Sequence, residues 1–255
     1  MQPNVIDVSH WNKVEDFHAL KAAGIQAVIT KATEGTYYKD KTYHDHIQRA
    51  REAGMLVGSY HFADNSNVEA QVDFYLDYVG DDASNTMLSL DWEPHPKGKG
   101  RTMSLEQAEQ FVTLIHDKTG QWPKLYSGNV VKEALRGGKH SEVLAKCDLW
   151  IAHYNPVATW PKQTWEKAWL HQYSETGRLP GIPGGNVDLN YYAGDDLAGE
   201  WIRSGKTKGP GAVEIGIGVG GGGLAVFSTA DWLTCAVVLV IVAGVVYWVW
   251  KKRQS

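Results

Sequence analysis

The sequence predicts an α/β fold, an irregular (β/α)8-like barrel that is followed by a Gly-rich linker and one transmembrane helix. Short apolar runs alternate with amphipathic stretches through the first two hundred or so residues, then a Gly-rich segment follows, and then a long uncharged apolar run. We therefore divide the 255 residues into a barrel (1–204), a linker (205–230) and a transmembrane helix with a basic tail (231–255).

Eight apolar runs have the length and composition of β-strands. They cover residues 4–7, 26–31, 56–62, 87–93, 124–127, 149–154, 168–173 and 185–190. Several of these runs are apolar without interruption, which indicates burial on both faces and therefore a parallel sheet that is covered by helices. Eight strands favour closure into a barrel, although about 200 residues is the lower limit for that fold.

Most of the stretches between these runs have the spacing of amphipathic helices. Residues 14–23 place apolar side chains on one helical face, and residues 108–115 do the same. Ser104 and Gln107 stand at the spacing of a capping box before the second of these helices. Residues 158–167 are too short and too rich in Trp and Pro for a regular helix, so we expect an irregular barrel.

The composition excludes intrinsic disorder and disfavours nucleic acid as a partner. The formal charge is -4, no basic stripe is present, and 11 Trp and 12 Tyr suggest aromatic-lined surfaces. Cys147 and Cys235 stand in very different surroundings and are interpreted as buried apolar residues rather than as a disulfide or nucleophiles. Residues 1–7 lack the basic and apolar regions of a cleaved signal peptide. Nothing in the sequence indicates an oligomeric state.

The linker and the apolar run that follows it predict a membrane anchor. Eight of the fifteen residues in 209–223 are Gly, which is typical of a flexible linker. Residues 233–250 carry no charge and, as a helix, would extend about 27 Å, close to the thickness of a bilayer core. Basic residues follow at 251–253, so we expect a single span with a cytoplasmic tail and an extracytoplasmic barrel. A buried core helix and a holin-like membrane-disrupting element are the alternatives.

Acidic residues stand at the ends of three predicted strands. Asp7 ends the first run, Asp91 and Glu93 end the fourth, and Asp188 ends the eighth. In a parallel barrel all strand C-termini lie at one rim, and the first and last strands are neighbours, so these four carboxyl groups are expected to converge there. Asp91 and Glu93 are two residues apart and leave the same face of a strand.

Carboxyl groups gathered in one cleft favour acid–base chemistry on sugars. Like charges cannot all ionise cheaply, so one group keeps its proton while another becomes an anion. That pair meets the requirement for hydrolysis of a glycosidic bond. A single strand-end Asp is more often a helix cap or turn residue, and a rim rich in Asp can also bind a divalent metal. We favour the glycosidase interpretation, with no metal and no cofactor.

Aromatic and polar side chains recur at the same strand ends and indicate a sugar-binding cleft. Aromatic rings cover the apolar faces of sugars, and amide and hydroxyl groups bind their hydroxyls. Packing inside the barrel is the alternative role for each one. The candidates for substrate binding are Tyr60, Phe62, Tyr126, Trp150, Tyr154, Gln172 and Asn190.

The sequence resembles the lysozymes of glycoside hydrolase family 25, the muramidases typical of phage endolysins. The resemblance covers roughly residues 5–192 and depends on the order and spacing of several segments. These are Ile6-Asp7-Val8-Ser9 with Trp11, Ile29-Thr30-Lys31-Ala32-Thr33-Glu34-Gly35, Gly58-Ser59-Tyr60-His61-Phe62, Leu90-Asp91-Trp92-Glu93, Leu149-Trp150-Ile151-Ala152 with Tyr154, His171-Gln172-Tyr173-Ser174, and Val187-Asp188-Leu189-Asn190.

The resemblance implies cleavage of the β-1,4 bond between N-acetylmuramic acid and N-acetylglucosamine in bacterial peptidoglycan. It implies that Glu93 is the general acid and that Asp91 stabilises the charged intermediate or orients the acetamido group of the substrate. Asp7 and Asp188 would then tune the pKa values, and the segment with Lys31 and Glu34 would contact the substrate. Neighbouring-group participation and direct attack by water both remain open.

The C-terminal part departs from the usual layout of the family. Many members carry cell-wall-binding repeats after the barrel, whereas here a Gly-rich linker and a predicted membrane span follow it. We therefore expect a membrane-tethered enzyme for host cell lysis or wall penetration. The alternative is a non-catalytic protein on the same barrel, which binds wall sugars or serves in virion or envelope assembly.

Overall fold

The computed structural model describes residues 2–202, 216–220 and 223–227. The chain divides into two compact units, Met1–Gly205 and Lys206–Ser255. In the second unit, β10 (Gly216–Gly220) and β11 (Gly223–Phe227) form an antiparallel pair within the range predicted to be a linker. Among the described residues, no helix combines the length and apolar character needed to cross a bilayer. The predicted span, residues 233–250, lies outside the described residues.

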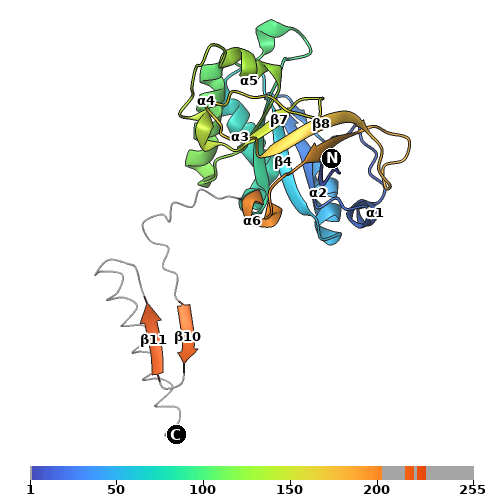
Figure 1. Cartoon of the computed structure of the whole chain (residues 1–255), viewed down its shortest axis with the longest axis vertical. Helices are drawn as coiled ribbons and strands as arrows, with labels where there is room; N and C mark the ends of the chain where they lie inside the picture. Colours follow the sequence, from blue (N-terminus) through green and yellow to red (C-terminus); the bar gives the residue numbers. More distant parts are fainter. Residues whose placement is uncertain (1, 203–215, 221–222, 228–255) are drawn as a thin grey trace. The chain divides into compact units, whose positions relative to one another are not determined.

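The first unit is a closed barrel of eight strands (Figure 1). Among the strands that the structure describes, a short ninth strand, β3, pairs only with the C-terminal end of β2. The barrel order is β1-β2-β4-β5-β6-β7-β8-β9, and the pairing of β9 with β1 closes it. The strands are β1 (Val5–Val8), β2 (Ala27–Glu34), β3 (Tyr38–Lys39), β4 (Leu56–Phe62), β5 (Met87–Trp92), β6 (Lys124–Ser127), β7 (Leu149–Ala152), β8 (Leu170–Gly177) and β9 (Val187–Tyr191).

All eight predicted strands are confirmed, but the expectation of an all-parallel barrel is wrong. The strand β9 runs antiparallel to both of its neighbours, β1 and β8. Residues 178–186, which join β8 to β9, contain no helix, so the chain turns back directly. A parallel pair needs a crossover of a dozen or more residues, which this connection is too short to provide. The result is a mixed barrel.

Helices lie outside part of the barrel (Figure 1). They are α1 (Phe17–Ala22), α2 (Tyr43–Glu52), α3 (Val68–Val79), α4 (Leu105–Thr119), α5 (Asn129–Ala134) and α6 (Leu197–Trp201), with 3-10 turns at Gly80–Asn85, Lys99–Arg101 and Leu144–Lys146. The predicted capping box is present at the start of α4, where Ser104 accepts from the backbone N–H of Gln107. No helix lies between β7 and β8, as the composition of residues 158–167 predicts.

Two apolar clusters hold the barrel together, one outside the strands and one inside. Alternate residues of a strand enter different clusters: Val28 packs outward toward the helices, whereas Ala27 and Ile29 pack inside. Trp201 of α6 closes the inner cluster, and its indole N–H donates to the carbonyl of Val57 at 2.8 Å. One end of the barrel is therefore filled, which leaves the opposite end for a site.

Gly58 on β4 lies close to two side chains of this inner cluster. A Cβ atom at Gly58 would lie 2.7 Å from Met87 Cε and 3.3 Å from the Trp201 ring. Both distances are shorter than ordinary van der Waals contact, so a larger residue would have to displace the end of the Met87 side chain and press on the Trp201 ring.

Candidate active site

The four predicted carboxylates converge on one cavity. Asp7 lies in β1, Asp91 in β5, Glu93 just after β5, and Asp188 in β9. All four line a cavity of about 230 Å³ at the barrel end opposite Trp201. The other lining residues are Tyr60, Tyr126, Trp150, Tyr154, Gln172 and Glu175.

Asp188 reaches this cavity by a route that differs from the one predicted. It is the second residue of β9 and does not end the strand. Because β9 is antiparallel to β1, its N-terminal end lies beside the C-terminal end of β1, and Asp188 pairs directly with Asp7. The reversed strand thus brings Asp188 to the expected rim.

Asp7 is buried and held by two amide side chains. Gln172 Nε2 donates to its two carboxylate oxygens at 3.0 and 3.2 Å, and Asn190 Nδ2 donates to Oδ2 at 2.7 Å. Burial raises the pKa of Asp7 to about 6, while these amide donors favour its anion and limit the rise. Burial, together with the negative charge of Asp7, raises the pKa of Asp188 to about 9.

Asp91 and Glu93 differ in exposure and in hydrogen bonding. Asp91 is buried, and its Oδ1 has no hydrogen-bond partner among the described residues. Burial and then the charge of Glu93 raise the pKa of Asp91 well above its usual range. Glu93 is partly exposed, and burial raises its pKa to about 7 although the positive charge of Lys31 opposes the rise. Glu93 can therefore hold and release a proton near neutral pH.

Aromatic and amide groups on the cavity wall are tied to one another. The hydroxyl groups of Tyr126 and Tyr154 both donate to Gln172 Oε1, at 2.9 and 3.1 Å. The side-chain nitrogen of Gln172, Nε2, donates to Asp7. One side chain therefore orients two phenol groups and a carboxylate. Trp150 Nε1 donates to Asn190 Oδ1 at 2.7 Å. The wall is pre-organised before any ligand binds.

Four of the residues predicted to bind substrate do not line this cavity. Asn190 is fully buried and acts instead through its bonds to Asp7 and Trp150. Lys31 Nζ lies 2.7 Å from Glu34 Oε2 and 4.9 Å from the centroid of the Phe62 ring. Lys31, Glu34 and Phe62 therefore form one packed group near the carboxylates, in which the charges of Lys31 and Glu34 pair with each other.

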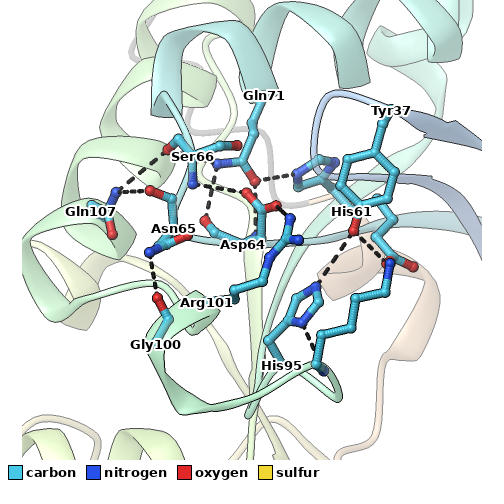
Figure 2. A network of polar contacts seen from close by, with 12 residues as sticks. Tyr37, His61, Asp64, Asn65, Ser66, Gln71, His95, Gly100, Arg101 and Gln107 are labelled. Atoms are coloured by element: carbon cyan, nitrogen blue, oxygen red, sulfur yellow. Dashed lines mark hydrogen bonds and ion pairs between the residues drawn. The ribbon is translucent and has the colours of Figure 1, made fainter.

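A polar network fixes the loops next to this group (Figure 2). Tyr37 donates to Glu34 Oε1 at 2.8 Å and lies 3.4 Å from His95 Nε2. Arg101 donates to the buried Asp64 at 3.0 Å, which ties the loop after β5 to the loop after β4. The loop that follows Glu93 is thus held in place through its residues His95 and Arg101.

Several residues at the site were missed by the sequence reasoning. Glu175 lines the carboxylate cavity, although strict alternation from Gln172 would place Ser174 there. The register of β8 against β9 shifts after Gln172 and again after Ser174, and these shifts turn Glu175 inward. Lys132 lines a neighbouring cavity, and no motif in the sequence marks it.

An acidic rim of this kind can also bind a divalent metal ion. Within the part of the chain that the structure describes, no group of three or more His, Cys, Asp or Glu residues is arranged to hold a metal ion.

A mixed eight-stranded barrel whose open end carries a set of buried carboxyl groups among aromatic rings is the architecture of a glycoside hydrolase. Residues 6–182 match the family model described as glycosyl hydrolases family 25. The chain belongs to this family and is a glycoside hydrolase, as its resemblance to the family's lysozymes predicts.

Comparisons with individual proteins agree with this assignment. Lysozyme M1 of Streptomyces globisporus is 32% identical over 200 residues, which cover 74% of this chain and 67% of that protein. A bacterial lysozyme structure from Streptomyces coelicolor has a TM-score of 0.68 at 30% identity and covers 79% of this chain and 96% of its own. A muramidase structure from Acremonium alcalophilum has a TM-score of 0.64 at 30% identity, with 74% and 93% covered.

Proposed function

We propose that the protein is a peptidoglycan hydrolase that cleaves the β-1,4 bond between N-acetylmuramic acid and N-acetylglucosamine. The observation that carries this proposal is the placement of Glu93 in one cavity with Asp7, Asp91 and Asp188. The named relatives, a lysozyme and a muramidase among them, support the substrate class.

In this mechanism Glu93 is the general acid. Its pKa of about 7 lets it carry a proton at neutral pH and give that proton to the leaving glycosidic oxygen. Positive charge then develops on the sugar ring, and the anion of Asp7, held by Gln172 and Asn190, stabilises it from the cavity wall. The oxygen of a water molecule forms the new bond to the anomeric carbon, either directly or after the acetamido oxygen of the substrate has done so, and the proton that this water loses returns to Glu93.

Asp91 positions the substrate in the same mechanism. Its Oδ1 is buried and lacks a hydrogen-bond partner among the described residues, which costs free energy in the unliganded protein. An acetamido N–H of the sugar would supply the missing donor. Binding of an N-acetylated sugar thus gives Asp91 Oδ1 a hydrogen-bond donor. A sugar without the acetamido group leaves this oxygen buried and unpaired.

Analysis of the released saccharides tests the bond specificity. The full-length protein is incubated with purified peptidoglycan, and the soluble products are reduced and identified by mass spectrometry. Products with muramic acid at the reducing end are expected. Products with N-acetylglucosamine at the reducing end would show a glucosaminidase and would contradict the proposal.

We also propose that the barrel is tethered to a membrane and acts on nearby peptidoglycan. Residues 233–250 are uncharged and apolar and are followed by Lys251, Lys252 and Arg253, which supports a single span with a cytoplasmic tail. Protease added to the cytoplasmic side of membrane vesicles should leave the barrel intact, and protease on the opposite side should degrade it. The reverse pattern would contradict this topology.

A role in lysis of a bacterial host, or in wall penetration, is the biological setting we propose for this tethered enzyme. The resemblance to phage endolysins supports it. Induced synthesis of the full chain in a bacterium should cause lysis, and synthesis of a Glu93→Gln chain at the same level should not. Equal lysis by both chains would show that the membrane segment alone does the damage.

A further inference from the structure

A second cavity of about 350 Å³ adjoins the carboxylate cavity and, unlike that cavity, is lined by a lysine. The two share Glu93, Tyr126 and Tyr154, so they are parts of one continuous depression on either side of the proposed acid. The other residues that line the second cavity are Pro94, Gly128, Asn129, Lys132, Ala152, His153 and Asn155.

The two cavities differ in the charged side chains that line them. Five acidic side chains and no basic one line the carboxylate cavity. In the second cavity Glu93 is the one acidic residue, at the shared edge, and Lys132 is the one Lys or Arg among the lining residues that the structure describes. A negatively charged part of a ligand therefore has a lower electrostatic energy beside Lys132 than in the carboxylate cavity.

Lys132 is held in place without being neutralised. It lies on α5, is partly buried, and its Nζ donates to His153 Nδ1 at 3.0 Å. The backbone N–H of Thr159 also donates to His153 Nδ1, at 3.2 Å, so this ring nitrogen is an acceptor and the imidazole is neutral. Within the described part of the chain, no carboxylate lies within 4.0 Å of Lys132 Nζ. The ammonium group keeps donors for a ligand.

We propose that the cavity around Lys132 and His153 is a subsite for a carboxylate carried by the sugar chain. This inference rests on the proposed function, because peptidoglycan is a glycan whose muramic acid units bear either a free lactyl carboxylate or a peptide that ends in one. Lys132 forms the charge-assisted hydrogen bond to that carboxylate, and His153 orients Lys132. The subsite thereby fixes which sugar stands on each side of Glu93.

Binding measurements on three ligands test the proposal. The full-length Glu93→Gln protein binds without cleaving, and calorimetry gives the Kd for muramic acid-containing tetrasaccharides with free lactyl carboxylates, with lactyl amides, or with lactyl-linked peptides. Adding Lys132→Met should raise the Kd of a carboxylate-bearing ligand about tenfold and change that of the neutral amide less than twofold. If the ligand with free lactyl carboxylates loses affinity, the subsite binds the lactyl carboxylate. If the ligand with lactyl-linked peptides loses affinity, the subsite binds a carboxylate of the peptide.

Two control variants separate a subsite from a general effect of charge or folding. Lys132→Arg keeps the positive charge and should stay within about threefold of the parent Kd. Lys118→Met removes an exposed lysine that pairs with Asp73 and lines neither cavity, and it should change no Kd. Equal losses on the charged and neutral ligands, or no loss on either charged ligand, would overturn the proposal. Because binding is read directly, this result stands even if the parent enzyme does not cleave peptidoglycan.

Discussion

Asp7 and Asp188 are direct partners across the antiparallel strands β1 and β9. Two carboxyl groups so close cannot both ionise cheaply, and their surroundings separate them. Amide donors favour the anion of Asp7, whose pKa is about 6, whereas burial and the charge of Asp7 raise the pKa of Asp188 to about 9. At neutral pH Asp188 therefore keeps its proton and donates it to Asp7 in a hydrogen bond.

Asp188→Asn should stabilise the fold at pH 8 but not at pH 3.5. A carboxyl whose pKa is raised from 3.8 to about 9 is stabilising below pH 3.8, and this stability is lost as pH rises through about 9. The Asn side chain cannot ionise and still donates to Asp7. We expect a Tm at least about 2–4 °C higher at pH 8, which corresponds to about 1 kcal/mol.

Exposed Asp195 offers the matched control for this stability measurement. Asp195→Asn makes the same change of residue type at an exposed position and should leave the Tm unchanged at both pH values. If Asp188→Asn lowers the Tm at pH 8, then the carboxyl group at this position stabilises the fold and the assigned protonation is wrong.

The pH dependence of kcat/KM should be a narrow bell. Activity needs a protonated Glu93, whose pKa is about 7, and an ionised Asp7, whose pKa is about 6. Rates should therefore fall below about pH 6 and above about pH 7, while Asp188 stays protonated across this range. Initial rates on a soluble glycan substrate at constant ionic strength give the profile. A rate that stays constant up to pH 9 would show that Glu93 is not the general acid.

Lys31→Met should move the alkaline limb of this profile to higher pH. After burial, the positive charge of Lys31 is the main influence on the pKa of Glu93, and it favours the anion. Without that charge Glu93 holds its proton at higher pH. Lys39→Met, which removes a lysine of the adjacent strand β3, should leave the limb in place. A shift in the acidic direction, or equal shifts in both variants, would contradict this electrostatic role.

Much of the fold could be predicted because burial on both faces leaves a strong pattern in the sequence. Runs such as Ala27–Ile29 are apolar without a break, since the helices cover one side and the inner cluster fills the other. The direction of β9 could not be predicted from its composition, because Val187–Tyr191 has the same pattern whichever way the strand runs. Only the short connection before it contained that information.

The site was partly predictable for a related reason. Asp7, Asp91 and Glu93 interrupt or end apolar strands, where a charge is costly and therefore noticeable. Glu175 lies within the second of two register shifts in β8, and Lys132 and His153 come from different segments of the chain. Their proximity depends on the folded structure, and their residue types are ordinary for exposed positions.

Glu93→Gln should abolish wall hydrolysis while leaving the fold intact. Gln has the shape of the protonated carboxyl group but cannot donate the proton to the leaving oxygen, so kcat should fall by at least about 10²–10⁴-fold. Turbidity clearing of cell walls measures the loss, and an unchanged Tm shows that the protein is folded. Wild-type clearing by this variant would disprove the acid assignment.

Asn190→Ala should weaken catalysis through Asp7 as well as the fold. Asn190 donates to Asp7 Oδ2 and accepts from Trp150 Nε1, both at 2.7 Å, in a fully buried position. Two buried groups lose a partner, which costs about 1–3 kcal/mol each. The pKa of Asp7 should rise, because a donor to its anion is gone, so the acidic limb of the pH profile should move to higher pH.

Asn4→Ala is the control for this measurement. It disrupts the hydrogen bonds to Tyr192, two residues after Asn190, and should lower the Tm without moving the acidic limb. A loss of stability with an unmoved acidic limb in Asn190→Ala would mean that Asp7 is not the group that ionises there.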